Sequence, residues 1–240
     1  SLCPIDDNDW LIDADSIELN LDKNRGYADS AKVVFYGVPI FYLPKYSWVL
    51  EGRGSGFLTP DYDNYKETSQ TKRSFRVRVP YYINIAPDRD LLVALNYMSS
   101  RGLVYEGKYR QLIKPKITKD LADSLFEIET HYLFDDKMTS LKRWLINTSI
   151  EFDFSEKTHL SAQYYRVSDT KYFKEIARTN TDVKTLKSNL KLNYDDPSIN
   201  LKAAILTEKE QVVNAGTPGY TRALEGSITK IFNADKKLPI

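Results

Sequence analysis

Two histidines and several pairs of neighbouring carboxylates are the residues of this sequence whose types could support acid–base or metal chemistry. His131 and His159 lie in different strand-like segments, and neither belongs to an HExxH motif or lies beside a GxSxG motif. The acidic pairs Asp6-Asp7, Asp135-Asp136 and Asp195-Asp196 fall in turn-like sequence, where short carboxylates bond to nearby backbone amides. We therefore predict no catalytic residue, no metal site and no cofactor, and we expect that the protein is not an enzyme.

Arg76 and Arg78 are the cations whose placement suggests ligand binding. They alternate with Phe75, Val77 and Val79, so the two guanidinium groups share one face of a strand and the apolar side chains share the other. Guanidinium groups bind phosphate through paired N–H donors, which makes both residues candidate phosphate contacts. Ion pairs with carboxylates of neighbouring strands explain the two arginines equally well.

The composition excludes several classes of protein. Its 34 Lys and Arg residues against 33 Asp and Glu give a net charge of +1, so no strong field marks the chain as a nucleic-acid binder. The nearest approach to a spanning helix, Val33 to Leu43, contains Gly37 and Pro39 and falls short of the roughly 18 apolar residues required. Any residence in a membrane must therefore use strands.

The dominant pattern is the alternation of apolar and polar residues, which predicts amphipathic strands and an all-β fold. The clearest example runs from Arg143 to Ser155, and Lys187 to Tyr194 repeats it. Weaker alternation covers Leu91 to Met98, Leu103 to Leu112, Ser124 to Leu133, His159 to Val167, Ile199 to Thr207 and Tyr220 to Ile231. Tight turns such as 155–157 alternate with long polar connections such as 168–184, as in an outer-membrane barrel. A soluble β-sandwich would alternate in the same way, but the strand lengths and the 17 tyrosines favour the barrel.

The first fifty residues have a different pattern. Shorter strand-like runs at 12–15, 17–21 and 32–36 are separated by a turn at 22–26, which indicates a soluble β-structure. We place a domain boundary near Leu43-Pro44, where a proline ends the apolar run.

Three consecutive motifs carry a resemblance to a known family. They are YGVPIFYLP at residues 36–44, GSGFLTP at 54–60 and VPYYINIAPDRD at 79–90. In this order they resemble the PVPIFY.PY, SGFL.P and LPYYWNIAP..D motifs of the LptD family, also called organic solvent tolerance proteins. Further on, residues 97–102 are similar to the family's YM..RG, and residues 165–173 to its YT.VSD..YF. Cys3-Pro4 with Trp10 is similar to its SCP…W segment.

The resemblance implies a fold and a location. Residues 1–43 would be the end of a periplasmic β-jelly-roll, and residues 44–240 the first part of a large antiparallel outer-membrane β-barrel. About ten barrel strands are expected. Because an open sheet of ten strands would leave edge N–H and C=O groups unpaired in lipid, we expect the chain to be a fragment of a longer protein. The barrel would lie in the cell outer membrane of a Gram-negative bacterium, with the N-terminal part in the periplasm.

The resemblance also implies a function and partners. The family transports lipopolysaccharide (LPS) and inserts it into the outer leaflet through a lateral gate between barrel strands. The expected partners are LPS, the lipoprotein plug LptE, the periplasmic bridge protein LptA and outer-membrane lipids. No nucleic acid is expected. The alternatives are a general porin or nutrient receptor, and, from another class, an outer-membrane hydrolase that uses His131 or His159.

Particular residues acquire roles through the resemblance. Pro60 and Pro80 each close a strand segment and lack the N–H that a ladder requires, and the same prolines occur in the family motifs at the strands that part. We therefore expect them at the lateral gate, with Arg76 and Arg78 as possible contacts of LPS phosphates. Cys3, the single cysteine, is a candidate for a disulfide with a cysteine beyond residue 240.

Overall fold

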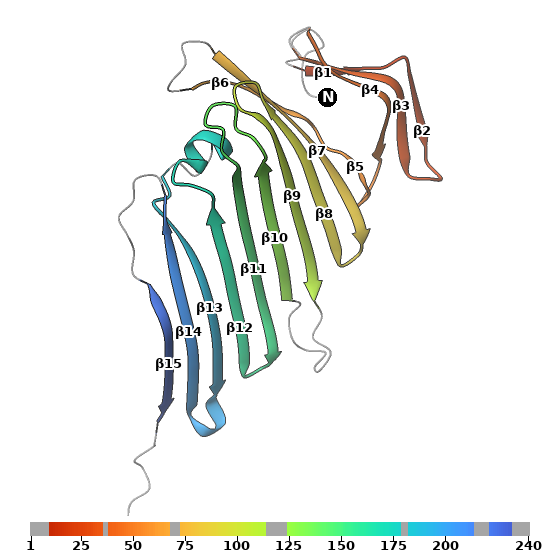
Figure 1. Cartoon of the computed structure of the whole chain (residues 1–240). Helices are drawn as coiled ribbons and strands as arrows, with labels where there is room; N and C mark the ends of the chain where they lie inside the picture. The colour runs from red at the N-terminus through yellow and green to blue at the C-terminus, as the bar shows by residue number, and fades with distance from the viewer. Residues whose placement is uncertain are drawn as a thin grey trace, which may run out of the picture.

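In a computed structural model the chain folds into two antiparallel sheets (Figure 1). The structure describes residues 10–35, 38–67, 73–113, 124–178, 182–213 and 221–231. Apart from two short helical turns, the regular elements in these ranges are strands, so the prediction of an all-β fold is confirmed. Within the same ranges, no helix is both long and apolar enough to cross a membrane.

The smaller sheet is built around one long strand. Its strands are β1 (Trp10–Asp13), β2 (Ser16–Asn20), β3 (Arg25–Phe35) and β4 (Val38–Val49). Both β1 and β2 pair with β3, β2 along its first half and β1 along its second, while β4 pairs with β3 along most of its length. This arrangement leaves β2 as an edge strand.

The predicted domain boundary at Leu43-Pro44 lies inside β4. The register places Pro44 opposite Ser30, which has a positive φ of 56°, and regular pairing continues on both sides of this position. The proline therefore does not end the strand. The chain leaves the small sheet only between Val49 and Gly56.

The larger sheet runs in sequence order from one edge to the other. Its strands are β5 (Gly56–Phe57), β6 (Asp61–Lys66), β7 (Arg73–Ala86), β8 (Arg89–Met98), β9 (Gly102–Ile113), β10 (Ser124–Leu133), β11 (Arg143–Ser155), β12 (Thr158–Val167), β13 (Thr185–Asp196), β14 (Leu201–Val212) and β15 (Arg222–Lys230). From β7 onward each strand pairs with the next, and β5 and β6 both pair with β7. The sheet is open: β15 forms one edge, and β5 with β6 forms the other. The closed barrel is therefore not formed by the described residues.

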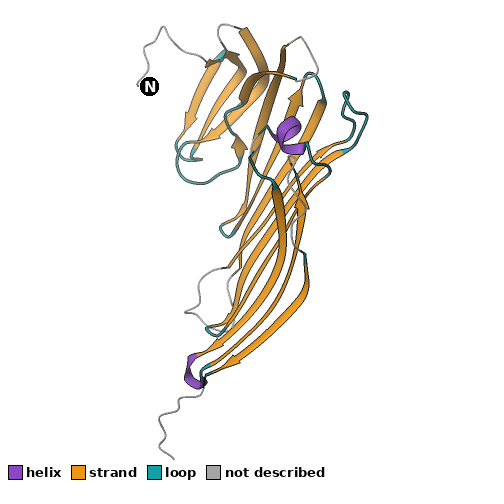
Figure 2. Cartoon of the chain, turned by 90° about the vertical axis from the view of Figure 1, so that its left-hand side faces the viewer, coloured by secondary structure: helices purple, strands orange, loops and turns teal. Residues whose placement is uncertain are grey.

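The two ends of the larger sheet differ. Short connections at 87–88 and 156–157, and the 3-10 turn η2 (Pro197–Ile199), lie at one end, which we call the turn end (Figure 1). The π-helical turn η1 (Phe173–Ala177) lies at the other, which we call the helix end. Figure 2 shows the two helical turns at opposite ends of the long strands.

One face of the larger sheet is apolar and carries aromatic side chains at two levels. Toward the helix end these are Tyr62, Phe75, Tyr97, Tyr105, Tyr132, Phe134 and Trp144. Toward the turn end they are Phe57, Tyr81, Tyr109, Phe126, Phe152 and Phe154. Aliphatic residues such as Val79, Leu95 and Ile150 lie between the two levels. Trp144 and Phe152 are separated by roughly 27 Å along β11 at about 3.4 Å per residue.

Outside the helix end the opposite face is largely polar, with Leu92, Leu112 and Leu125 among its apolar side chains. At the helix end η1 packs on the sheet and buries Tyr172, Phe173 and Ile176 against Val104 and Leu145. This apolar cluster closes the polar face at one end and leaves its centre and its turn end open to polar side chains.

Candidate functional site

Pro60 belongs to a β-bulge at the first edge of the larger sheet. Phe57 pairs with Tyr81 and Asp61 pairs with Arg78, both on β7. Residues 58–60 of the edge therefore oppose only residues 79–80 of β7, and the extra residue interrupts the ladder. The bulge separates β5 from β6, and Pro60 lies at its end, directly before β6.

Pro80 lies within β7 and does not end it, which corrects the expectation that it closes a strand segment. β7 continues to Ala86 because the carbonyl of Pro80 still accepts a hydrogen bond, from Leu58 N at 3.0 Å. In an antiparallel strand the N–H and C=O of one residue point to the same side, so the missing N–H of Pro80 faces the bulge. Opposite Ala94 on β8, Pro80 occupies a non-hydrogen-bonded position, and pairing with β8 loses nothing. Pro80 thus removes one donor from the seam between β7 and the first edge, and Pro60 lies at the end of the bulge in the same seam.

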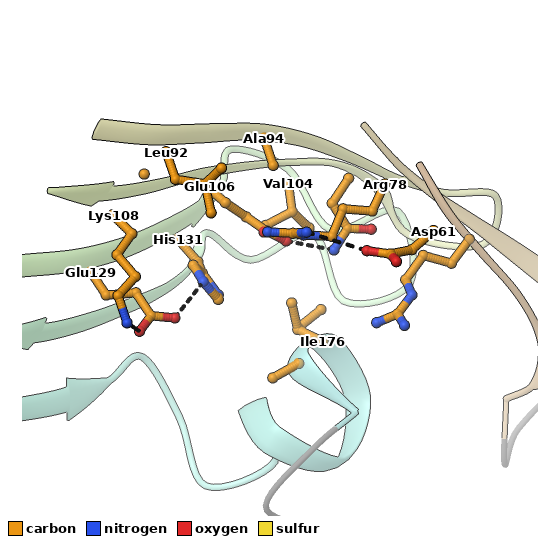
Figure 3. A pocket seen from close by; sticks show the side chains of 14 residues that line it. Asp61, Arg78, Leu92, Ala94, Val104, Glu106, Lys108, Glu129, His131 and Ile176 are labelled. Carbon is orange, nitrogen blue, oxygen red and sulfur yellow. Dashed lines mark hydrogen bonds and ion pairs between the residues drawn. The ribbon is translucent and has the colours of Figure 1, made fainter. Parts of the chain in front are cut away.

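Arg76 and Arg78 lie on the polar face beside this seam, but their surroundings differ. Arg78 Nε donates to Glu106 Oε2 at 2.7 Å, and its Nη1 donates to Asp61 Oδ2 at 3.2 Å (Figure 3). Arg76 has only a 3.9 Å ion pair with Asp63, and its buried Nε has no hydrogen-bond partner among the described residues. Arg78 is therefore neutralised by carboxylates of neighbouring strands, whereas Arg76 keeps donors for another group.

A cavity of about 290 Å³ opens beside both arginines (Figure 3). Its charged lining is mixed, with Arg76, Arg78 and Lys108 against Asp61, Glu106 and Glu129. Lys108 Nζ lies 2.9 Å from Glu127, a further carboxylate on the same face. With its cations largely matched by carboxylates, the cavity is a polar chamber and lacks the excess positive charge of an anion site.

The two histidines lie on different strands and contact different side chains. His131 on β10 lies 3.2 Å from Glu129 and 3.0 Å from the hydroxyl of Tyr172, while His159 on β12 lies 2.6 Å from Asp153. Burial raises the pKa of Tyr172 well above its usual range, so this phenol stays protonated. In the part of the chain that the structure describes, no group of three or more potential ligands could hold a metal ion.

A buried ion-pair network at the helix end is a feature that the sequence did not reveal. Arg101, in the turn after β8, binds Glu67 through two hydrogen bonds of 2.7 and 3.0 Å and Asp136 through one of 2.7 Å. The side chains of Arg101, Glu67 and Asp136 are only 3%, 5% and 0% exposed. Burial lowers the pKa of Arg101, but the bonds with Glu67 and the charge of Asp136 outweigh it, and the net shift is upward.

Arg143 extends the network to the segment that holds η1. Its Nη1 donates to Asp136 and to Glu175, each at 3.0 Å, and its Nη2 donates to Asp169 at 2.9 Å. Arg101 belongs to residues 97–102 and Asp169 to residues 165–173, two segments singled out as motif-like in the sequence. The network therefore joins these two motifs and fixes η1 against the sheet.

A second cluster, at the turn end, anchors the connection between the sheets. Asp90 accepts two hydrogen bonds of 2.9 Å from Arg110 and one of 2.7 Å from Arg53, and Tyr82 also donates to it. Arg53 lies in the segment between β4 and β5. It also donates to the carbonyl of Pro87 at 3.1 Å, so this connection is tied to the turn end.

No family model matches the chain. LPS-assembly protein LptD of Shewanella sp. strain MR-4 is 33% identical over 177 residues, which is 72% of this chain and 22% of that protein. The chain belongs to the LptD family. LptD of Azoarcus sp. strain BH72 is 33% identical over 74% of the chain, and LptD of Cupriavidus necator 29% identical over 92% of it.

The match with LptD covers only part of each relative. The chain spans 20 to 26% of the length of these three relatives, so it corresponds to a part of LptD. The resemblance stated from the motifs is confirmed. The relatives are named for LPS assembly and not for a reaction, in agreement with the expectation of a non-enzymatic protein. Cys3 lies outside the described residues.

Proposed function

We propose that this chain is the part of an LptD protein that contains the lateral gate for LPS, in the outer membrane of a Gram-negative bacterium. The observation that carries the proposal is the bulge at 58–60, which opposes Pro80 at the first edge of the sheet. Two strands whose ladder lacks donors separate at a lower free-energy cost than two fully paired strands, because fewer hydrogen bonds are broken.

The larger sheet has the properties of a barrel wall. Its apolar face carries an aliphatic band between two aromatic levels, the pattern of strands that face lipid between two interfaces. Its edges at β15 and at β5–β6 would leave unpaired backbone groups in lipid, so further strands of a complete LptD would close the sheet. The polar face would then line the lumen.

The smaller sheet fits the end of a periplasmic β-jelly-roll. We propose that this domain extends to Val49, beyond the boundary at residue 43, because β4 belongs to the small sheet throughout. On its edge strand β2, Ile17 and Leu19 are 64% and 59% exposed, and Leu21 beyond it is 80% exposed. This row of exposed apolar side chains would bind the acyl chains of LPS before the lipid reaches the bulge.

Partners follow from the same proposal. LPS would pass from the bridge protein LptA to the small sheet and then to the gate, where Arg76 would contact its phosphates. LptE would occupy the lumen against the polar face. For Arg78 the ion pairs with Glu106 and Asp61 make a phosphate contact the weaker proposal.

Reconstitution of a full-length LptD that contains this chain would test the function against a porin and a hydrolase. We expect LPS to reach the outer leaflet of vesicles, with little steady ion conductance when LptE is bound. Conductance unaffected by LptE would support the porin. Hydrolysis of lipid or peptide that is lost on His131→Ala or His159→Ala would support the enzyme.

A further inference from the structure

Cations gather on the apolar face of the larger sheet at its helix end. They are Lys66, Arg73, Lys137, Arg166 and Lys209, which we call the basic band. Strand register assigns four of them to this face: Lys66 pairs with Arg73, Arg166 with Ile146 and Lys209 with Ser188. Lys137 is assigned by contact, because its Nζ lies 5.9 Å from the ring centroid of Tyr97.

Among the described residues, the cations of the basic band have no carboxylate partner. None of its members forms an ion pair within 4.0 Å with a residue that the structure describes. On the polar face, by contrast, Arg78, Lys108 and Arg110 each lie 2.7 to 2.9 Å from a carboxylate. At the turn end Lys157 is likewise paired, with Asp196 at 2.8 Å.

The carboxylates of the helix end do not offset this charge. Glu67, Asp136, Asp169 and Glu175 are held by Arg101 and Arg143 in the buried network. Asp135, an exposed carboxylate near Lys137 in sequence, forms no ion pair with it. The helix end of the apolar face is therefore positively charged.

Below the part of the basic band formed by Lys66, Arg73 and Lys137, the same face is apolar and hollowed. Arg73 is followed on its face by Phe75, and Arg166 is preceded on its face by Tyr164. A groove of about 870 Å³ runs from this level over β7, β8 and β9, lined by Phe75, Val77, Val79, Leu95, Tyr97 and Tyr105. From the helix end downward, the face thus carries cations, then aromatic rings, then an apolar groove. A membrane lipid has its phosphate, its interfacial region and its acyl chains in the same order.

We propose that the basic band with its groove binds a phosphate-bearing membrane lipid on the outside of the sheet, as a site separate from the gate. The lysine and arginine stems cover apolar surface while their charged ends reach the phosphate level. A free anion fits less well, because the cations are spread along a rim and do not converge in a cavity. The proposal rests on the proposed function only in taking the apolar face as the lipid-facing one.

Spin-labelled lipids in vesicles test the site without any transport. Full-length LptD that contains this chain is folded into phosphatidylcholine vesicles with labelled phosphatidic acid or labelled diacylglycerol of the same chains. We expect the immobilised fraction to favour phosphatidic acid, and this preference to weaken as salt is added. The variant Lys66→Gln, Arg73→Gln, Lys137→Gln should reduce the preference by roughly fivefold or more.

The matched control removes the same charge from the small sheet, with Lys23→Gln, Lys32→Gln and Lys45→Gln, and should keep the preference. The proposal would be overturned if both variants lost the preference for phosphatidic acid equally, or if the first variant kept it. Displacement of the lipid by inorganic phosphate at constant ionic strength would also overturn it. If the triple variant does not fold, Lys137→Gln should lower the preference and Lys137→Arg restore it. A protein that binds phosphatidic acid in this way but delivers no LPS would contradict the proposed function. The proposal of a lipid site at the basic band would still hold.

Discussion

Pro60, directly before β6, ends the bulged segment 58–60, and Pro80 lies opposite this segment on β7. Residues 58–60 bulge against residues 79–80, and Leu58 N still donates to the carbonyl of Pro80 at 3.0 Å. One hydrogen bond therefore still joins β7 to the first edge at Pro80, where the N–H donor of the proline is missing.

Restoring the donors should tighten this seam. Pro60→Ala with Pro80→Ala adds two N–H groups, and the one at residue 80 faces the first edge, where it could contribute about 0.5 to 1.5 kcal/mol. We expect β5 and β6 to hold β7 more firmly and LPS release to slow, while assembly of the protein stays normal or improves. The measurement is ultraviolet crosslinking of LPS to the periplasmic domain, compared with LPS delivered to the cell surface.

Pro197→Ala, in the η2 turn far from the seam, is the matched control and should leave delivery unchanged. Normal delivery by the double variant at normal protein level would reduce both prolines to structural residues without a gating role.

The buried network should dominate stability at the helix end. Arg101→Met leaves Glu67 and Asp136 as buried charges without their shared partner, which should cost about 3 to 5 kcal/mol. Lys202→Met removes an exposed pair with Asp195 and should cost less than about 1 kcal/mol. Urea titration of the full-length protein in vesicles measures both, and similar costs for the two variants would show that the network is not structural.

The assignment of the two faces predicts different costs for a new arginine on β11. Ile150→Arg on the apolar face should cost about 2 to 4 kcal/mol if this position lies near the middle of the membrane. Glu151→Arg, one residue away on the polar face, should cost far less. Folding titrations in lipid vesicles compare the two, and equal costs would reject the assignment.

Local periodicity was sufficient to predict most of the larger sheet. The alternation from Arg143 to Ser155 matches β11 residue for residue, because side chains on a strand must alternate between faces. The same rule correctly placed Arg76 and Arg78 together on the polar face.

What the sequence could not reveal depends on contacts between distant residues. The side of a strand to which Pro80 turns its nitrogen depends on register, so the proline was taken as a strand end. The continuation of β4 through Pro44 could not be predicted either, because it depends on pairing with β3. The network was missed because Arg101 is 34 residues from Glu67 and 35 from Asp136.

Cys3 remains a prediction. A lone cysteine in an oxidising compartment should pair with a cysteine beyond residue 240 of the complete protein. Non-reducing electrophoresis should then show a mobility shift that reductant abolishes. An oxidised pattern left unchanged by Cys3→Ser would exclude this bond.

The most direct test of the gate is a photo-crosslinking amino acid placed at Thr59, inside the bulge, in full-length LptD exporting LPS in cells. Gln163, on the polar face of β12 and away from the first edge, is the comparison position. The account predicts an LPS adduct at position 59 that disappears when LPS transport is stopped, and little adduct at position 163. LPS adducts at Ile17 in the small sheet without any at Thr59 would contradict it.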